Sequence, residues 1–160
     1  TATVETTEST QVVETTQTRE VRAGSSYLSQ SDLALTFGLE RDPRAAVAEA
    51  VGFIEDAGRR HGIEHPIQMT VATTDGDTTW AFRYSSERNS RSLFHSTDIA
   101  TLRDQYPDNP LLHDLSDDAR LVVSEPLGDL RGAWQEVPDA TCVVVHGGEQ
   151  ELYPFAPAAP

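Results

Sequence analysis

The sequence predicts an α+β fold, on three observations. Apolar residues recur at helical spacing across residues 43–61, and several short runs with the alternation typical of strands follow them. Asp-Gly and Gly-Gly pairs separate some of these runs, as tight turns between antiparallel strands do. With 160 residues, of which 38% are hydrophobic and 24% charged, the chain is long enough to bury the core of one globular domain.

Residues 1–32 form a threonine-rich lead-in to this pattern. Eight threonines lie within residues 1–26, and the valines among them are too sparse to bury one face of a strand. We expect an exposed β-ribbon or a disordered segment here, with a loop at Gly24-Ser25-Ser26. Because the sequence begins at Thr1 rather than at a methionine, we expect a trimmed, processed or partial chain.

The clearest single element is a helix over residues 43–61. Asp42 is a suitable N-cap, and Pro43 fits the first helical position, where a missing N–H leaves no hydrogen bond unmade. Gly62 is the residue type expected just beyond the C-terminal end, after arginines that suit the helix dipole. The apolar face is formed by Val47, Ala50, Val51, Ile54 and Ala57.

Short strands are predicted after this helix. Asp75-Gly76 separates two alternating runs and is a strong signal for a hairpin. In the second run, Trp80, Phe82 and Tyr84 alternate, which places them on one face and favours core packing over a ligand platform. The predicted strands are residues 67–73, 78–84, 92–95, 120–124, 134–137, 141–146 and 150–155. Short helices at 98–106 and 111–115 and a frayed tail at 158–160 complete the prediction.

The charge balance argues against two classes of partner. The chain has 12 arginines, no lysine and 26 acidic residues, which gives a net charge of −14. Such a chain repels the phosphates of nucleic acids and of anionic membranes, so we expect neither as a partner. No apolar run is long enough to span a bilayer, no secretory signal is recognisable, and a cytoplasmic location fits best.

The sequence shows no convincing grouping of metal-binding residues. A single cysteine, Cys142, leaves no internal disulfide framework and no multi-cysteine zinc site. His61 and His65 are four residues apart, but Gly62 and Pro66 break the helix that would align them as ligands. Phosphate loops and dinucleotide fingerprints are also missing from the sequence. We therefore expect neither a metal nor a cofactor.

Several consecutive motifs carry a family resemblance. They are QMTVATTDG at 68–76, WAFRYSS at 80–86, SLFHS at 92–96, LVVSEPL at 121–127 and WQEVP at 134–138. In order and spacing they resemble segments of class II glutamine amidotransferases of the stand-alone, YafJ-like group, over roughly four-fifths of the chain. The resemblance implies that residues 33–157 are the C-terminal part of a four-layer αββα N-terminal-nucleophile sandwich, with antiparallel sheets between helices.

The same resemblance implies glutamine amide hydrolysis by a cysteine at the mature N-terminus. Its thiolate attacks the side-chain amide of glutamine, or of a γ-glutamyl amide, and its own α-amino group is the general base. Cys142 is internal, so it has no α-amino group to offer, and we expect a buried small hydrophobe. Thr1 is also a possible N-terminal nucleophile, but a polar segment follows it rather than a core strand. We therefore predict no catalytic residue in this chain and no activity of the chain alone.

Three residues match family positions and are candidates for substrate binding or for support of the site. Arg83 can pair with an acidic group there, while Ser124 and Glu125 belong to the Ser-Glu-Pro stretch. The alternative for Arg83 is a strand residue with its head group in solvent. The alternative for Ser124 and Glu125 is simply the end of a strand.

The preceding segment resembles a different family. Residues 16–32 are similar to the ASPIC/UnbV module, which also runs through a Leu-x-Leu-x-Phe-Gly-Leu stretch like that at 33–39. The two patterns meet in this short string, so we hypothesise a chimeric origin by recombination, engineering or misassembly. An uninterrupted genomic read across codons 20–60 is incompatible with an artefact of assembly.

Two further functional hypotheses remain beside an inactive amidotransferase fragment. The chain can be a non-enzymatic binding or scaffold module that kept the sheet and lost the chemistry. Alternatively, it can be a half-domain that needs a partner chain bearing the cysteine. Removing half of a two-sheet sandwich exposes apolar faces and unpaired strand edges, so we also expect self-association.

Overall fold

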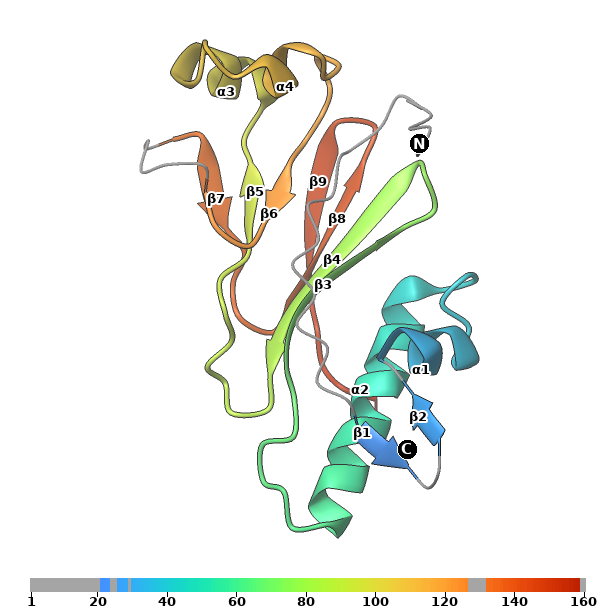
Figure 1. The fold of residues 1–160 in the computed structure, drawn as a ribbon. Coiled ribbons are helices and arrows are strands. Elements are labelled where there is room, and N and C mark those ends of the chain that lie inside the picture. Colours follow the sequence, from blue (N-terminus) through green and yellow to red (C-terminus); the bar gives the residue numbers. More distant parts are fainter. Residues whose placement is uncertain (1–20, 24–25, 29, 127–131, 159–160) are drawn as a thin grey trace.

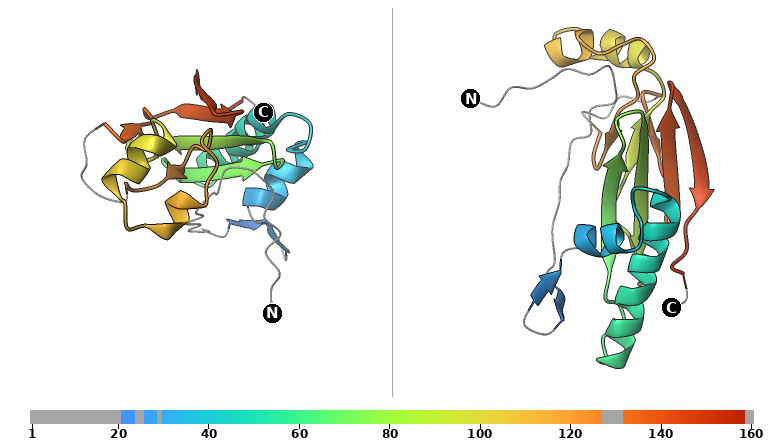
Figure 2. Two further views of the ribbon diagram at one scale, coloured as in Figure 1. Left: turned by 90° about the horizontal axis from the view of Figure 1, so that it is seen from above. Right: turned by 90° about the vertical axis from the view of Figure 1, so that its right-hand side faces the viewer.

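The computed structural model describes residues 21–23, 26–28, 30–126 and 132–158. Two antiparallel sheets lie side by side, and the long helix α2 (Pro43–Arg60) covers one face of the larger sheet (Figure 1). The smaller sheet and its helices lie on the other side of the larger sheet, as the rotated views confirm (Figure 2). The predicted α+β fold with antiparallel sheets is therefore confirmed.

Helix α2 has the ends that its sequence predicts. The Asp42 carboxylate accepts a hydrogen bond from the Ala45 N–H at 3.1 Å, and Pro43 is at the start of the helix. His61 caps the C-terminal end, and Gly62 follows with φ of +72°, a conformation that glycine adopts without strain. The predicted helix at 43–61 is thus confirmed to within one residue.

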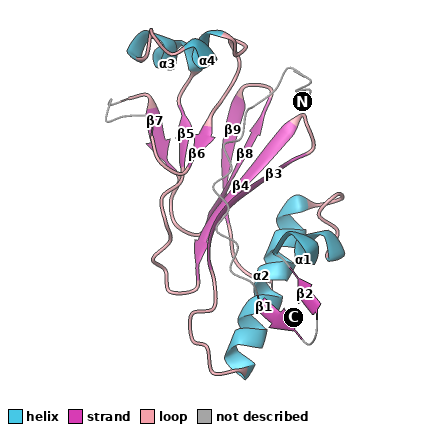
Figure 3. Ribbon diagram, in the orientation of Figure 1, coloured by secondary structure: helices cyan, strands magenta, loops and turns pink. Residues whose placement is uncertain are grey.

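A second helix precedes α2 and was not predicted. Helix α1 (Gln30–Thr36) packs against α2, and its Leu33 and Ala34 are buried in the same core. Before α1, strands β1 (Val21–Ala23) and β2 (Ser26–Leu28) form a small antiparallel hairpin (Figure 3). The boundary expected between residues 32 and 33 falls inside α1. The rest of the predicted ribbon, residues 1–20, lies outside the described residues.

The larger sheet has four strands in the order β3-β4-β8-β9. Strands β3 (Gln68–Thr74) and β4 (Thr78–Ser85) form the predicted hairpin, and β8 (Thr141–His146) and β9 (Glu149–Pro154) form the second one. At the first turn the Asp75 carboxylate accepts the N–H groups of Thr78 at 2.7 Å and Asp77 at 3.0 Å. These hydrogen bonds, that from Thr78 above all, hold the pKa of Asp75 below its usual value.

The smaller sheet has three strands in the order β6-β5-β7. Its strands are β5 (Phe94–Ser96), β6 (Val122–Val123) and β7 (Trp134–Glu136), all shorter than the sequence pattern indicates. Strand β6 pairs with Phe94 and His95 of β5. Helices α3 (Ile99–Gln105) and α4 (Pro110–His113) lie over one end of this sheet (Figure 1).

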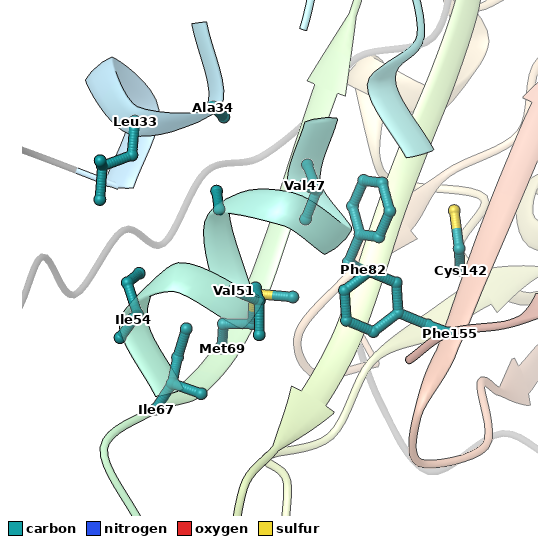
Figure 4. Packing of buried hydrophobic residues seen from close by; sticks show 11 residues of the cluster. Leu33, Ala34, Val47, Val51, Ile54, Ile67, Met69, Phe82, Cys142 and Phe155 are labelled. Carbon is teal, nitrogen blue, oxygen red and sulfur yellow. The ribbon is translucent and has the colours of Figure 1, made fainter. Parts of the chain in front are cut away.

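The principal core lies between α2 and the larger sheet. Phe82 is fully buried at its centre, and its ring meets that of Phe155 edge-on at 5.4 Å between centroids (Figure 4). Trp80 and Tyr84 pack against the same cluster, as their alternation predicts. A second cluster, formed by Ala81, Leu93, Val122, Val137, Val143 and Val145, fills the space between the two sheets.

The last described residue, Ala158, contacts α2, while the frayed tail expected at 158–160 stays a prediction. The Ala158 N–H donates to the Ala48 carbonyl at 2.9 Å, and residues 159 and 160 lie outside the described part. A Cβ atom on Gly52 would stand 1.8 Å from the Ala158 carbonyl oxygen. The absence of a side chain at Gly52 is therefore what lets the tail reach the helix backbone. Composition could not reveal this contact because it depends on one helix position far away in the sequence.

Candidate functional site

Arg83 connects the two sheets. From β4 its Nε donates to the Ser90 hydroxyl at 2.9 Å, and its Nη1 donates to a Glu136 carboxylate oxygen at 2.6 Å. The same Nη1 also donates to the Val137 carbonyl, just after β7. The side chain is only 12% exposed, so its head group does not project into solvent. Its position supports a role in holding β4, β7 and the loop before β5 together.

Ser124 and Glu125 lie at the end of β6. The Ser124 carbonyl accepts a hydrogen bond from the Ser92 hydroxyl at 2.9 Å, which ties the end of β6 to the chain before β5. Ser124 is half-buried and Glu125 is exposed. Within the described residues, no hydrogen bond or ion pair joins either of them to Arg83. The three candidates from the sequence thus do not form one hydrogen-bonded group.

Cys142 lies in the core rather than in a reactive setting. Its side chain is 1% exposed, packs in the cluster around Phe82, and makes only a weak contact of 3.8 Å to the Val143 carbonyl. Burial raises the pKa of the thiol to about 12. A protonated, enclosed thiol is a poor nucleophile, because the thiolate is the reactive form.

A cleft of about 600 Å³ lies beside the C-terminal half of α2. The end of β4 and the start of the C-terminal tail form its other walls. Residues 64–66 and 139–140 also line it, so segments that are far apart in the sequence meet here. Its polar lining includes Glu55, His65, Tyr84, Ser86, Arg88 and Asp139.

Glu55 organises the floor of this cleft. One of its carboxylate oxygens accepts the Tyr84 hydroxyl at 2.6 Å and the Ser86 hydroxyl at 2.8 Å. Burial, followed by the hydrogen bond to Glu55, raises the pKa of Tyr84 well above its usual value. Tyr84 therefore stays protonated and acts as a hydrogen-bond donor, not as a base.

Two non-glycine residues with positive φ line the cleft. Arg88 has φ of 59° and Ala140 has φ of 53°, and among the described residues no other non-glycine residue adopts this conformation. Such left-handed residues are uncommon outside glycine and are often found at ligand sites. Arg88 and Asp139, the residue before Ala140, are both exposed and carry opposite charges. The lining of the cleft therefore carries side chains of both charges.

Sequence reasoning did not find this cleft. Glu55 looks like any acidic residue on the polar face of an amphipathic helix, and Ser86 and Asp139 look like residues at strand ends. In the part of the chain that the structure describes, no group of three or more His, Cys, Asp or Glu side chains is placed to hold a metal ion. No described helix is long and apolar enough to cross a bilayer.

Comparison with known proteins gives two matches, to proteins of two different kinds, and their matched ranges overlap along the chain. The family model described as ASPIC and UnbV matches residues 1–49. A solved structure, that of a glutamine aminotransferase class-II domain protein from Silicibacter pomeroyi, superimposes with a TM-score of 0.64 and 29% sequence identity. The match covers 81% of this chain and 51% of that protein, so the chain spans about half of its length. No curated protein matches the chain.

The two matches agree with the two resemblances carried by the sequence motifs. The chain is similar, in fold and in sequence, to a class II glutamine aminotransferase domain protein. The ASPIC and UnbV match reaches from the lead-in into α2, beyond the residues 16–39 that suggested it. The chimeric junction at 33–39 stays a prediction.

Proposed function

We propose that this chain is the C-terminal part of a class II glutamine amidotransferase-type domain and is inactive by itself. The observation that carries the proposal is the 29% identity to the class-II domain protein, over 81% of this chain and only half of the other. The complete domain hydrolyses the side-chain amide of glutamine, or of a related γ-glutamyl compound. The nucleophile then belongs to a polypeptide segment outside these 160 residues.

The chemistry of the amide explains why the nucleophile must come from elsewhere. In the proposed cysteine mechanism a thiolate attacks the amide carbon, and a nearby base must take the thiol proton. Cys142 has neither, because it is buried among apolar side chains with its pKa raised to about 12. An N-terminal cysteine supplies both groups in one residue, since its α-amino group is the base.

In this proposal Arg83 is a positioning residue. Its hydrogen bonds to Ser90, Glu136 and Val137 fix the relative placement of the two sheets. Ser124 and Glu125 stand at the end of β6, where a segment from the missing half can reach them. They are proposed to contact the glutamine or to support the residues that do.

A glutaminase assay tests the proposal. The purified chain is expected to release no glutamate above the blank. Addition of a polypeptide carrying the cysteine-bearing half is expected to give glutamate release that rises with its concentration and disappears when its first cysteine is replaced by alanine. Any turnover by the chain alone contradicts the proposal, and Cys142→Ala and Thr1→Ala then identify whether either residue is responsible.

A second candidate is a binding module without chemistry, and the cleft at Glu55 favours it. Arg88 and Asp139 present opposite charges at a cavity large enough for an amino acid. Glutamine titrated into the pure chain is then expected to shift the NMR signals of these residues. An Arg88→Gln variant should weaken the effect, while the distant exposed variant Arg41→Gln should not. Unchanged spectra at saturating glutamine count against this candidate.

A further inference from the structure

The edge strand β3 has unusual composition for an exposed edge. Its seven residues, Gln-Met-Thr-Val-Ala-Thr-Thr, include no charge and no proline, although charged residues make up 24% of the chain. The opposite edge, β9, carries Glu149 and Glu151 and ends at Pro154. Open edges in stable monomers are usually protected by such charges and prolines. Among the residues that the structure describes, no strand pairs with the outer side of β3. By this criterion β9 is protected, whereas β3 is open to a further strand.

The hydrogen-bond pattern identifies which backbone groups face outward from β3. The Ser86 N–H donates to the Ile67 carbonyl, and the Asp75 N–H donates to the Thr78 carbonyl, so these two pairs are hydrogen-bonded pairs of the β3–β4 ladder. In an antiparallel ladder such pairs alternate with non-hydrogen-bonded pairs. Odd-numbered residues of β3 therefore bond to β4. The N–H and C=O groups that point to the open edge belong to Gln68, Thr70, Ala72 and Thr74.

We infer that β3 is a self-association edge, on which the β3 strand of a second copy of this chain pairs in antiparallel fashion. A twofold axis at Val71 places Gln68 opposite the partner's Thr74 and Thr70 opposite the partner's Ala72. All four outward-facing residues of each copy are then paired, with about eight backbone hydrogen bonds across the axis. The result is one continuous sheet of eight strands.

A second copy fits this edge better than an unrelated strand for two reasons. The paired strands carry no charge, and each face of the joined sheet keeps the same kind of covering in both copies. Each copy has a net charge of −14, yet β3 brings no charge into the new ladder. Residues directly opposite in an antiparallel pair share a face. Val71 and the partner's Val71 thus both lie on the face covered by α2, and each Ala72 lies on the face toward the smaller sheet. This inference is independent of glutamine chemistry and of the proposed function.

Light scattering with matched proline variants tests the inference. The full chain is expected to be a dimer whose association strengthens with salt, because salt screens the repulsion between two acidic copies. Ala72→Pro removes an outward-facing N–H from each copy and leaves the β3–β4 hydrogen bonds intact, so it should weaken dimerisation by at least about tenfold. Leu152→Pro is the matched control, since Leu152 occupies an outward-facing position on β9, and it should leave the dimer unchanged.

A cysteine cross-link tests the register without relying on a proline. Val71→Cys places two thiols opposite each other in a non-hydrogen-bonded pair, at a spacing of about 4.5 Å between Cα atoms that permits a disulfide. Thr73→Cys is the control, because it lies opposite the partner's Met69 and not opposite itself. The native Cys142 can remain, since it is buried. Monomeric chain at every concentration, a dimer indifferent to Ala72→Pro, equal cross-linking at 71 and 73, or capture of a different polypeptide on β3 each overturns the inference.

Discussion

At the scale of single residues, Gly52 illustrates how one position can decide where a distant segment lies. Glycine inside a helix lowers stability relative to alanine, by roughly 0.5–1 kcal/mol. It is nevertheless required at this point of α2, because the Ala158 carbonyl occupies the space of a side chain. A residue of low helix propensity at this position thus allows the tail to donate its Ala158 N–H to the Ala48 carbonyl.

We predict that Gly52→Ala lowers the free energy of unfolding by about 1–3 kcal/mol, because the new methyl group displaces the tail. Urea denaturation followed by circular dichroism measures this change. In a chain that ends at Phe155 the same substitution should instead raise stability by up to about 1 kcal/mol, through helix propensity alone. The same sign of effect in both chains would contradict the account of Gly52.

Cys142 gives a pH prediction. Below about pH 9 the thiol is protonated in both states, while above it the unfolded thiol ionises and the folded one, with a pKa of about 12, does not. The folded state then binds more protons, so stability falls as pH rises from about 9 toward 12. The loss from this group is about 1 kcal/mol by pH 10. Urea titrations across this range should show a shallower decline for Cys142→Ala than for the unchanged chain; equal slopes would rule out the thiol as a cause.

At the scale of elements, β4 is the strand on which the other parts depend. It pairs with β3 and β8, presents Phe82 to the α2 side and Ala81 to the other side, and carries Arg83. Arg83 alone reaches from this strand to the Val137 carbonyl beyond β7. The relative position of the two sheets therefore rests partly on one guanidinium.

We predict that Arg83→Met lowers the free energy of unfolding by about 1–3 kcal/mol, because it leaves the Val137 carbonyl and the Ser90 hydroxyl without their partner. Glu136→Gln should cost less than about 1 kcal/mol, since Glu136 is 54% exposed and its pairing is weakened by solvent. Thermal denaturation of both variants provides the comparison. A larger loss for Glu136→Gln than for Arg83→Met would show that the ion pair, not the carbonyl contact, holds the sheets.

The sequence predicted an element well when the residues that start, end and bury it all lie within or next to that element. Helix α2 has a cap, an apolar face and a terminal glycine within its own sequence, and the hairpins have their turn residues. Helix α1 has no such signals: Leu33, Leu35, Phe37 and Leu39 alternate like a strand, and the helix is held by burial of Leu33 and Ala34 against α2.

At the scale of the whole molecule, the candidate site was beyond sequence prediction for a topological reason. The cleft joins Glu55 of α2, Tyr84 of β4, Asp139 before β8 and Ala156 of the tail. Nothing local marks these residues, because each acquires its role only when four remote segments meet. Cys142, by contrast, was predictable as a buried side chain, since it lies in an apolar strand pattern.

The net charge of −14 makes the folded molecule sensitive to ionic strength. Self-repulsion opposes compaction, and salt screens it over a Debye length that shrinks from about 30 Å at 0.01 M to about 3 Å at 1 M. We predict that the melting temperature rises as NaCl is increased over this range. Measuring the Ala72→Pro variant, which is expected to be monomeric, separates the screening of self-repulsion from any effect of salt on dimerisation. A melting temperature that falls with NaCl would show that favourable ion pairs outweigh the repulsion.

The pairing of β4 with β8 has a consequence for how the chain acquires its structure during synthesis. Residues 78–83 bond to residues 141–146, and the whole smaller sheet with α3 and α4 is made between them. When β4 leaves the ribosome, only β3 is available to pair with it. Its second partner, β8, is made only after most of the remaining chain has been synthesised. Phe155, which closes the core around Phe82, arrives later still. Such non-local pairing slows folding, so one side of the central strand β4 stays unpaired in the nascent chain until β8 has been made.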